Sequence, residues 1–426
     1  MSIAGILFMM LLMAMPRVII IGGGGTGAAL AYDLSLRGIE VTLLERGELT
    51  SGTTGRHHGQ LHCGARYAVQ DTGIGRECMQ ESAILRRIAP ASIEFNYGLF
   101  VAITEEDEQY CDTFLPACAA CGIPTRVLKP KRALAMEPNL NPKLRLAVQV
   151  PDGSMDAWRL ALQFFASARY NGADIRSFCE VVGLNLSSGG AVGTQFRVTG
   201  VRILDYRSRE ECNLEADLVI NATGAWSKRI ARLAGIDISV SPSPGTMVAV
   251  RGRLTNMVIS RLHPAGDGDI IVPQRNLSII GSTQRLAENP DSIETPEEDV
   301  GKLQRLAAEM VPAFKDAPYH TAWSAARPLV GEASGEGLRA LSRDFSLIDH
   351  GGPDRVERFL SILGGKATTL RAMAEITADQ ACQQLGIQAS CRTAEYPLRP
   401  ARSFYSAHAQ RAPASGANAG SEERIV

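Results

Sequence analysis

One stretch near the beginning of the chain constrains the fold more than any other. The apolar run Val18–Ile21 is followed by Gly22, Gly24 and Gly27, which have the G-x-G-x-x-G spacing. An alanine-rich helical pattern comes next, and a second apolar run completes the unit. This order predicts a buried strand, a tight turn, a helix and a second parallel strand, which together begin a nucleotide-binding α/β domain.

Each glycine in this unit has a physical role in holding a dinucleotide. Gly22 permits the tight turn, Gly24 lets a pyrophosphate approach the backbone, and Gly27 lets the helix pack against the strand. The helix N-terminus offers free N–H groups and the positive end of its dipole. The second apolar run, 41–44, ends on Glu45, where a carboxylate would accept hydrogen bonds from an adenosine ribose. The alternative is a glycine-rich turn without function, which the flanking strand, helix and acidic residue disfavour.

The loop after Glu45 favours a flavin over a nicotinamide cofactor. Residues 50–55 are all Gly, Ser or Thr, and residues 56–59 read Arg-His-His-Gly. A nicotinamide-dependent chain usually continues directly into another helix and strand. An isoalloxazine ring needs close backbone contact, which a long loop of small residues provides.

The segment SGTTGRHHGQLHCGARYAV, residues 51–69, resembles the second signature of FAD-dependent glycerol-3-phosphate dehydrogenases, most closely the large flavoprotein subunit of the anaerobic type. Residues 150–175, 323–329 and 364–369 resemble the same family, which belongs to the D-amino-acid-oxidase-like superfamily. The resemblance implies FAD and the oxidation of sn-glycerol 3-phosphate to dihydroxyacetone phosphate. The hydride would pass from C2 to FAD N5, and the electrons onward to a quinone or a membrane-associated partner.

The predicted fold is α/β, with a discontinuous Rossmann-like FAD-binding domain and a substrate domain built from a second, mostly antiparallel β-sheet plus helices. Strand-like runs at 247–250, 270–272 and 277–280 lack the spacing of βαβ units, which favours antiparallel pairing. Residues 130–142 read as a polar, turn-rich segment. We expect residues 17–70, 150–240 and 345–395 to form the FAD-binding domain, 71–149 and 241–344 the substrate-binding domain, 1–16 an apolar extension, and 396–426 a disordered tail.

The motifs and the resemblance assign five short segments to the cofactor. They are the glycine turn, the end of the second strand, the small-residue loop, the Ala-Thr-Gly turn after the strand 216–221, and the turn at 364–368. N–H groups of the last turn would face the pyrimidine end of the flavin, where negative charge develops on reduction. For the Ala-Thr-Gly turn, a simple strand–helix connection is the alternative. The full set, which adds Val181 outside these segments, is Gly22, Gly24, Gly25, Thr26, Gly27, Glu45, Arg46, Ser51, Gly52, Thr53, Arg56, His57, His58, Gly59, Val181, Ala222, Gly224, Trp226, Gly364, Gly365, Lys366, Ala367 and Thr368.

A small dianionic phosphate ester needs positive charge in a water-poor pocket, preferably from planar guanidinium groups. The resemblance places Arg66, Arg327, Arg343 and Lys366 around the substrate. The hydroxyl of Tyr67 is a further candidate to hydrogen-bond the phosphate. The proline after Arg327 restricts that arginine to an extended backbone. The alternative for each cation is a surface charge or an interdomain salt bridge, and for Tyr67 a place in the core.

Oxidation of a secondary alcohol removes a hydride from carbon and a proton from oxygen. A histidine suits the proton, because its ordinary pKa lies near neutrality. His62 matches the family's histidine in Leu-His-Cys-Gly-Ala-Arg-Tyr, so His62 and Arg327 are the predicted catalytic residues. Two positions depart from the family pattern: Cys63 replaces the usual Ser or Gly, and Leu370 replaces a frequent Tyr. The competing hypotheses are a related 2-hydroxyacid dehydrogenase or amine oxidase, and a flavin-binding protein without catalytic activity that assembles with partners.

Composition narrows the class of partner and compartment. The 426-residue chain has a net charge of −1 and no long run of one sign, which gives no reason to expect nucleic acid binding. Its nine cysteines form no cystine framework, so we expect a reducing compartment. The motif Cys118-x-x-Cys121 reads as buried small residues, with a metal or redox site as the alternative, and no metal is expected.

The apolar run at residues 3–14 is too short to cross a hydrocarbon core about 30 Å thick. A secretory signal would require a basic residue before the apolar run, and none is present there. We interpret it as an N-terminal extension, with a shallow membrane anchor as the alternative. The expected location is the cytoplasm, with peripheral association at the inner face of the cytoplasmic membrane.

Overall fold

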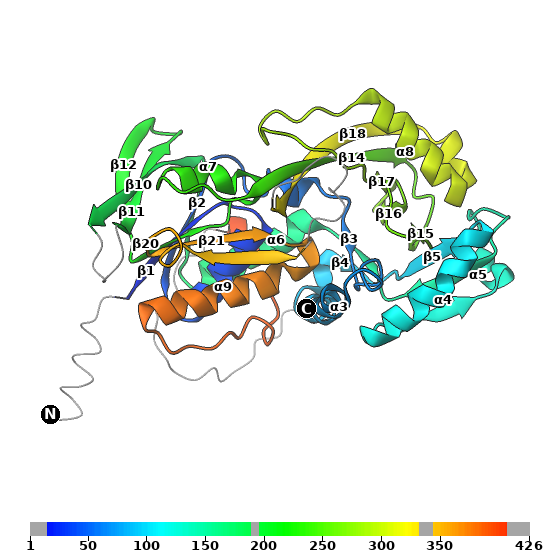
Figure 1. Ribbon diagram of the computed structural model, residues 1–426, viewed down its shortest axis with the longest axis horizontal. Coiled ribbons are helices and arrows are strands. Elements are labelled where there is room, and N and C mark those ends of the chain that lie inside the picture. Colours follow the sequence, from blue (N-terminus) through cyan, green and yellow to red (C-terminus); the bar gives the residue numbers. More distant parts are fainter. Residues whose placement is uncertain (1–14, 189–195, 332–343, 407–426) are drawn as a thin grey trace.

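The computed structural model describes residues 15–188, 196–331 and 344–406 (Figure 1). Its central feature is a six-stranded sheet in the order β19-β21-β13-β1-β2-β9. Five strands are parallel, and β19 joins the edge antiparallel. The strands are β1 (Arg17–Ile21), β2 (Glu40–Glu45), β9 (Asp174–Ser177), β13 (Leu218–Asn221), β19 (Phe345–Asp349) and β21 (Phe359–Gly364).

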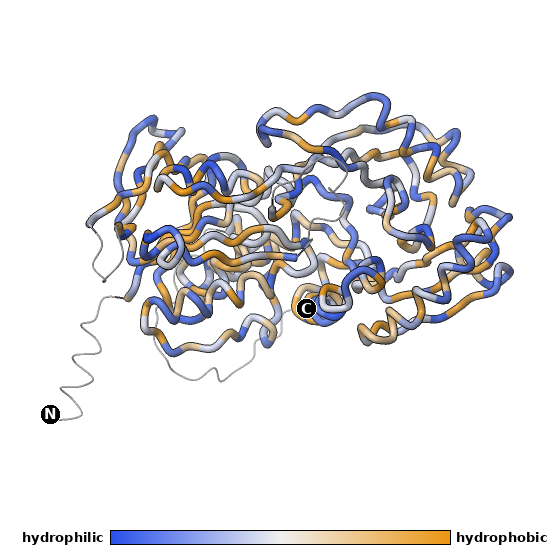
Figure 2. Tube along the Cα trace, in the orientation of Figure 1, coloured by the Kyte–Doolittle hydropathy of each residue, from blue (hydrophilic) through white to orange (hydrophobic). Residues whose placement is uncertain are grey.

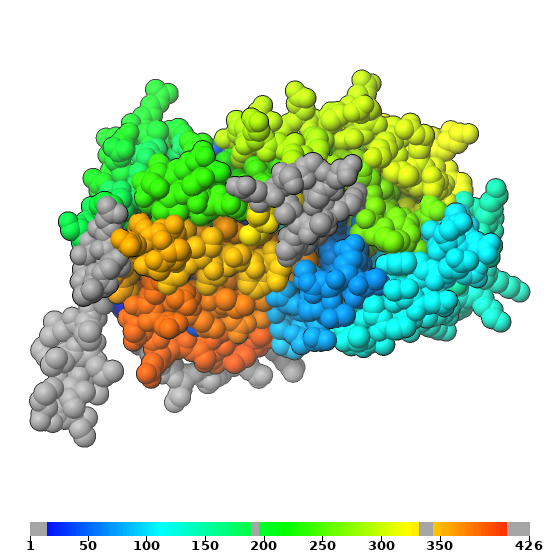
Figure 3. Space-filling view, in the orientation of Figure 1, coloured from blue at the N-terminus to red at the C-terminus, as the bar shows by residue number. Residues whose placement is uncertain are grey.

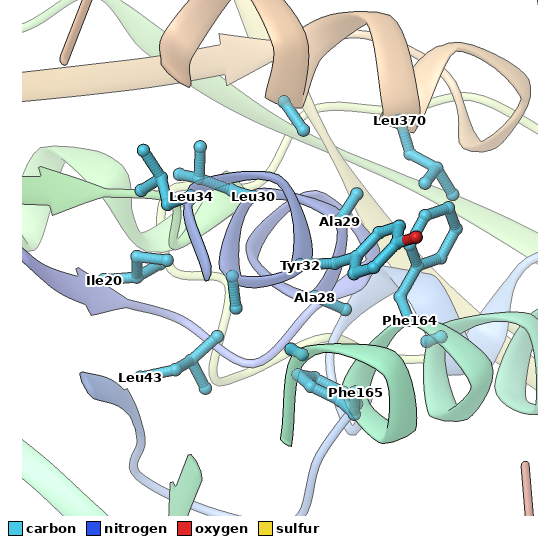
Figure 4. Close-up of a cluster of buried hydrophobic side chains, with 14 of the residues drawn as sticks. Ile20, Ala28, Ala29, Leu30, Tyr32, Leu34, Leu43, Phe164, Phe165 and Leu370 are labelled. Carbon is cyan, nitrogen blue, oxygen red and sulfur yellow. The ribbon is translucent and has the colours of Figure 1, made fainter. Parts of the chain in front are cut away.

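Three helices cover one face of this sheet: α2 (Gly25–Leu36), α6 (Ala157–Tyr170) and α9 (Leu370–Leu385). Figure 4 shows Ile20 and Leu43 of the strands facing α2, and Phe164 and Phe165 of α6 on its other side. Alternate strand residues point to opposite faces, and because both faces are covered, the central strands β1, β13 and β21 are mostly apolar and buried. Figure 2 shows the central strands as mostly hydrophobic.

The opposite face is covered by an antiparallel meander and a short helix. They are β10 (Cys179–Ser188), β11 (Phe196–Asp205), β12 (Glu210–Glu215) and α7 (Ser227–Arg232), with β20 (Val356–Glu357) paired to β11. Their apolar side chains form a second core cluster with the alternate residues of the central strands. The apolar pattern at residues 178–184 predicts a short strand, which corresponds to the first strand of this meander.

A second sheet of eight strands has the order β18-β14-β17-β16-β15-β5-β7-β6. Its pairs are antiparallel, except that β5 and β15 run parallel. This agrees with the expected mostly antiparallel sheet. The strands are β5 (Gly98–Ala102), β6 (Arg126–Leu128), β7 (Leu146–Val150), β14 (Val240–Arg251), β15 (Val258–Arg261), β16 (Ile270–Gln274), β17 (Leu277–Gly281) and β18 (Tyr319–Val330).

Helices α4 (Glu105–Ala120), α5 (Pro130–Met136) and α8 (Glu297–Met310) accompany the eight-stranded sheet, at the end of the molecule away from α9 (Figure 1). A small sheet lies between the two large ones and contains β3 (Gln60–Leu61), β8 (Gly153–Met155) and β4 (Ile93–Glu94). Helix α3 (Thr72–Ile88) lies beside α9 on the face shown in Figure 3. Arg371 of α9 joins the two helices by donating to the buried Glu81 over 2.9 Å.

Two expectations about local structure were wrong. The segment 130–142 begins with α5, because a proline at the first helical position needs no N–H partner there. The predicted disordered tail begins too early: residues 401–405 form a 3₁₀ turn, and Phe404 is buried against Phe165 with ring centroids 6.0 Å apart. Residues 407–426 and 1–14 lie outside the described residues. The division into domains stays a proposal, supported by the ranges that supply the strands of each large sheet.

The contact between α2 and β1 yields a stability prediction. A Cβ at Gly27 would lie 2.0 Å from the carbonyl oxygen of Gly22, so the helix would have to move away from the strand. We expect Gly27→Ala to lower the free energy of unfolding by about 1–3 kcal/mol, the usual cost of overpacking. Gly301→Ala in α8, where the nearest atom is the end of the Arg305 side chain, is the matched control.

Urea denaturation of both variants and the parent protein measures the effect. The control should be as stable as the parent or more stable by up to about 1 kcal/mol, because alanine favours helix more than glycine does. A Gly27→Ala protein that unfolds at the parent's urea concentration would contradict the close packing.

Candidate active site

A cavity of about 430 Å³ opens at the carboxyl ends of the central parallel strands. Its wall includes the ends of β1, β2 and β21 and the turn after β13, and also reaches β18 of the eight-stranded sheet. Ligands of open α/β sheets bind in this position, because the strand ends and the N-termini of the following helices converge there.

The glycine turn forms one side of the cavity. Gly22 has φ +112°, and a Cβ there would lie 2.6 Å from the carbonyl oxygen of Ala222, so the turn after β1 packs directly on the turn after β13. Gly24 and Gly25 line the cavity without side chains, and α2 begins beside them with no side-chain N-cap. The N-terminus of α2, which carries the positive end of the helix dipole, therefore faces the cavity.

Glu45 lies at the end of β2, as predicted, and its position is fixed by the backbone. Its Oε2 accepts from Gly23 N–H at 2.7 Å, and its Oε1 accepts from Gly47 N–H at 2.9 Å. Each carboxylate oxygen has a second lone pair, so the group keeps acceptor capacity toward the cavity.

The small-residue loop joins the two large sheets. The Thr54 hydroxyl accepts from Gly25 N–H at 2.9 Å, which holds the loop against the start of α2. The Thr53 hydroxyl donates to the Ala326 carbonyl of β18, and the indole N–H of Trp323 donates to the Arg56 carbonyl at 2.6 Å. This loop thereby sets how β18 lies over the glycine turn.

The cavity suits the FAD that the resemblance implies. Thr50 Oγ1 and His57 Nε2 are buried and have no hydrogen-bond partner within the described residues, and both residues line the cavity. Buried polar atoms of native proteins are nearly always paired, so these atoms indicate a ligand in the space beside them. The glycines without side chains offer room for a pyrophosphate, and the N-terminus of α2 offers the positive end of its dipole.

A row of polar rings continues from this loop to the turn after β21. His62 is only 8% exposed, and its ring lies 5.3 Å from that of Tyr67 and 5.9 Å from that of His58, edge to face in both cases. Lys366 Nζ lies 5.3 Å from the centroid of the Tyr67 ring, a cation–π distance. The backbone N–H of His62 donates to the Thr368 hydroxyl at 3.1 Å, which ties this row to the β21–α9 turn.

Arg327 enters the cavity from β18. Its guanidinium donates to the Ser282 hydroxyl and, over 3.0 Å, to the Thr283 carbonyl. Gly245 on the neighbouring strand makes room for it, since a Cβ at Gly245 would lie 2.2 Å from the guanidinium. Asp299 Oδ2 in turn accepts from the Thr283 hydroxyl at 2.9 Å, so the segment that holds Arg327 is itself held.

Arg66 also lines the cavity, but as one half of a buried ion pair. Two of its nitrogens each donate to Asp269 over 2.8 Å, and Gly266 O accepts at 3.2 Å. Burial disfavours the guanidinium charge, but Asp269 outweighs burial and raises the pKa of Arg66. Arg66 is thus charged and largely neutralised by its partner, the salt-bridge alternative considered from the sequence.

Every predicted site residue that the structure describes lines this cavity, except Gly27 and Gly59. Gly27 packs α2 onto the turn, and Gly59 uses its N–H to bond His57. Arg343 lies outside the described residues. The functional roles of these residues stay predictions, although the structure brings them to one place.

Two acidic residues that support the cavity were missed in the sequence. Asp152, 2% exposed, accepts from Cys63 N–H at 2.7 Å and from the Gln60 side chain at 2.9 Å, so it anchors the loop that carries His62. Asp291 pairs with Arg46 and accepts from the Trp226 indole at 2.8 Å. The bond from Arg46 lowers the pKa of Asp291. Asp152 lies in the segment 150–175 that resembles the family and Asp291 in no such segment, but the partners of both residues are too distant in sequence for a local pattern to reveal them.

The described residues contain no group of three or more His, Cys, Asp or Glu side chains arranged to hold a metal ion. Cys118 and Cys121 lie in an apolar cluster with Phe100 and Phe114, and burial raises the pKa of the Cys118 thiol to about 12. In the described part of the chain, no helix combines the length and apolar character needed to span a bilayer.

Comparison with known proteins gives a consistent result. The family model of FAD-dependent oxidoreductases, abbreviated DAO, matches residues 17–380. The chain is 41% identical over 396 residues to one subunit of the anaerobic glycerol-3-phosphate dehydrogenase of Haloferax volcanii, covering 91% of this chain and 67% of the relative. It is 39% identical over 383 residues to the corresponding subunit of the Escherichia coli K12 enzyme, covering 89% and 69%.

Solved structures share the fold. Glycine oxidase from Geobacillus kaustophilus superimposes with a TM-score of 0.70 at 24% identity, covering 90% of this chain and 99% of that one. Glycerol-3-phosphate dehydrogenase from Bacillus halodurans, complexed with FAD, superimposes with a TM-score of 0.68 at 24% identity, covering 91% and 68%. At this identity the likeness establishes the α/β fold with its two large sheets.

The anchor beneath the His62 loop yields a second stability prediction. Asp152→Ala would leave Cys63 N–H and the Gln60 amide without their acceptor, and each buried donor left so costs roughly 1–3 kcal/mol. We expect a loss of about 2–4 kcal/mol in the free energy of unfolding, measured by urea denaturation. Asp152→Asn should lose less, because its oxygen still accepts from Cys63.

The matched control is Asp237→Ala, which removes an exposed carboxylate paired with Lys228 and Arg232 at the surface. Such pairs contribute about 0–1 kcal/mol, so this variant should unfold close to the parent. Equal stabilities for the Asp152→Ala and Asp237→Ala proteins would rule out the anchoring role.

Proposed function

This chain belongs to the FAD-dependent oxidoreductase family and, within it, to the group of flavoprotein subunits of anaerobic glycerol-3-phosphate dehydrogenases, and from this premise we propose that it oxidises sn-glycerol 3-phosphate to dihydroxyacetone phosphate. The observation that carries the proposal is one cavity that joins the glycine turn to a cationic, histidine-containing end. Identity of 39–41% over about nine-tenths of the chain supports the same substrate.

We propose that the substrate occupies the end of the cavity lined by His62, Tyr67, Arg327 and Lys366. When bound, FAD supplies the acceptor for the hydride that leaves C2 of the substrate. The task of the chain's own residues is to bind the phosphate, orient the C2 hydroxyl and remove its proton.

His62 is the proposed base for the hydroxyl proton. It lies in the cavity wall and is 8% exposed, so little water surrounds it. Two hydrogen bonds from consecutive backbone N–H groups hold its loop. His62 N–H donates to the Thr368 hydroxyl, and Cys63 N–H donates to the Asp152 carboxylate. A base fixed in this way keeps its geometry while it accepts the proton.

Arg327 and Lys366 are the proposed phosphate-binding cations. Arg327 donates to the Ser282 hydroxyl and the Thr283 carbonyl, which orient the guanidinium. Arg66 forms its bidentate pair with Asp269 and is better suited to shaping the wall than to binding the phosphate directly. Arg343 remains a proposed contact from outside the described residues.

We further propose that the electrons pass to a quinone or to a partner protein, and that the chain works in the cytoplasm at the inner face of the membrane. The names of its relatives support a partner, since the Haloferax volcanii and Escherichia coli proteins are each named as one subunit of an enzyme.

An anaerobic titration tests the reaction. Glycerol 3-phosphate should bleach the absorbance of the FAD-loaded protein, and L-2-hydroxyglutarate should not. His62→Ala should retain the flavin and slow its reduction by about 10²–10⁴-fold, the usual contribution of a general base. His320→Ala, at an exposed position at the start of β18, is the control and should match the parent. A flavin that glycerol 3-phosphate leaves oxidised would refute the proposed function.

Arg327→Ala tests the phosphate contact separately. Loss of a charge-assisted hydrogen bond costs roughly 1.5–3 kcal/mol, so KM for glycerol 3-phosphate should rise by about 10–10²-fold, with FAD still bound. Arg232→Ala, an exposed arginine of α7, is the control. Steady-state kinetics with an artificial electron acceptor measure both, and an unchanged KM in Arg327→Ala would remove this residue from the site.

A further inference from the structure

Two consecutive histidines in the loop after the 3₁₀ turn Thr53–Arg56 are held by the same local device. Gly59 N–H donates to Nδ1 of His57 at 2.9 Å, and Gln60 N–H donates to Nδ1 of His58 at 3.1 Å. A ring nitrogen that accepts a hydrogen bond carries no proton. In the neutral ring the proton must then be on the other nitrogen. The backbone therefore assigns the Nε2–H tautomer to His57.

Burial keeps His57 neutral. The pKa of His57 is lowered to about 4, and burial is the cause. At neutral pH the ring is thus a neutral hydrogen-bond donor through Nε2, and it brings no positive charge into the cavity.

The Nε2 donor of His57 is buried and unsatisfied within the described residues. An amide-like donor left in this state costs roughly 1–3 kcal/mol, so native proteins rarely keep one without a function. His57 lines the cavity between Thr54, which contacts the start of α2, and His62, which we place at the substrate. The His57 ring centroid lies 6.1 Å from that of His58, which in turn lies 5.9 Å from that of His62, so His57 is two rings away from the residue that we place at the substrate.

We propose that His57 donates a hydrogen bond from Nε2–H to the flavin ring of the bound cofactor and thereby raises its reduction potential. This rests on the proposed function only in taking FAD as the ligand. Reduction places electron density on the ring, and a fixed donor stabilises the electron-rich form more than the oxidised form. His57 would thus set how readily the flavin accepts electrons, without taking part in proton removal.

Two substitutions of His57 test the roles of the two ring nitrogens separately. In His57→Asn, the amide oxygen can take the place of Nδ1 and keep the bond from Gly59, but no group reaches the position of Nε2. In His57→Gln, the longer side chain can place an N–H near the position of Nε2, but the acceptor for Gly59 is lost. Neither substitution introduces a charge, so electrostatic side effects are matched.

The experiment measures the midpoint potential of the FAD-loaded proteins by equilibration with a redox dye under slow reduction, without substrate. His57→Asn should show about a tenfold lower equilibrium constant for two-electron reduction, a shift of about −30 mV. His57→Gln should retain a potential close to that of the parent. A wild-type potential in His57→Asn overturns the proposal, and so does a glutamine variant that does no better than the asparagine variant.

Urea denaturation measures the structural role of His57 in the turn separately from its effect on the flavin potential. Loss of the Gly59 bond should lower the urea midpoint of His57→Gln but leave His57→Asn close to the parent. Because dyes rather than glycerol 3-phosphate reduce the flavin, the potentials stand even if the proposed substrate fails. His320→Ala again serves as the control at a histidine remote from the cavity wall.

The tautomer has its own test in the cofactor-free protein. With only seven histidines in the chain, selective ¹⁵N labelling resolves the ring nitrogens, and the His57 signals are those missing from His57→Gln. We expect a protonated Nε2 and an unprotonated Nδ1 at neutral pH. A protonated Nδ1 would overturn the proposal at its first step.

Discussion

The contact between the turn after β1 and the turn after β13 is the constraint on which the rest of the structure depends. At Gly22 a Cβ would lie 2.6 Å from the carbonyl oxygen of Ala222, and at Gly27 one would lie 2.0 Å from the carbonyl oxygen of Gly22. Three segments therefore pack backbone against backbone, with no room for a side chain between them: the end of β1, the start of α2 and the Ala-Thr-Gly turn. Any side chain at these glycines would push the segments apart and widen the edge of the sheet where the cavity opens.

The second sheet completes the cavity because it is tied to the same edge. The Thr53 hydroxyl bonds β18 through Ala326, and Asp299 of α8 holds Thr283, whose carbonyl anchors Arg327. A cation placed on a strand and fixed by such supporting bonds keeps its position without a bound ligand. The site is thus largely preorganised, which lowers the conformational cost of binding a small substrate.

The sequence predicted those parts of the arrangement whose interacting residues are close together in the chain, and missed those whose partners are distant in the chain. The glycine turn and Glu45 were recognisable because their pattern is local and fixed by the backbone of one βαβ unit. The helix at Pro130–Met136 was missed because a proline begins a helix as readily as a turn, and only packing decides between them. Asp152 and Asp291 were missed because their roles depend on backbone and side chains 65 to 245 residues away that no spacing reveals.

Arg66 and Arg327 show why residue type alone could not rank the predicted cations. Both line the cavity, and the sequence pattern does not distinguish them. Arg66 directs the flat edge of its guanidinium at Asp269, which is 203 residues away, so the pair contributes a rigid wall with little net charge. Arg327 donates to the Ser282 hydroxyl and the Thr283 carbonyl, which orient its guanidinium. Removing Arg66 would leave the buried carboxylate of Asp269 without its partner and damage the wall. The groups that hold a cation, rather than its presence in a motif, therefore decide whether it can bind a phosphate.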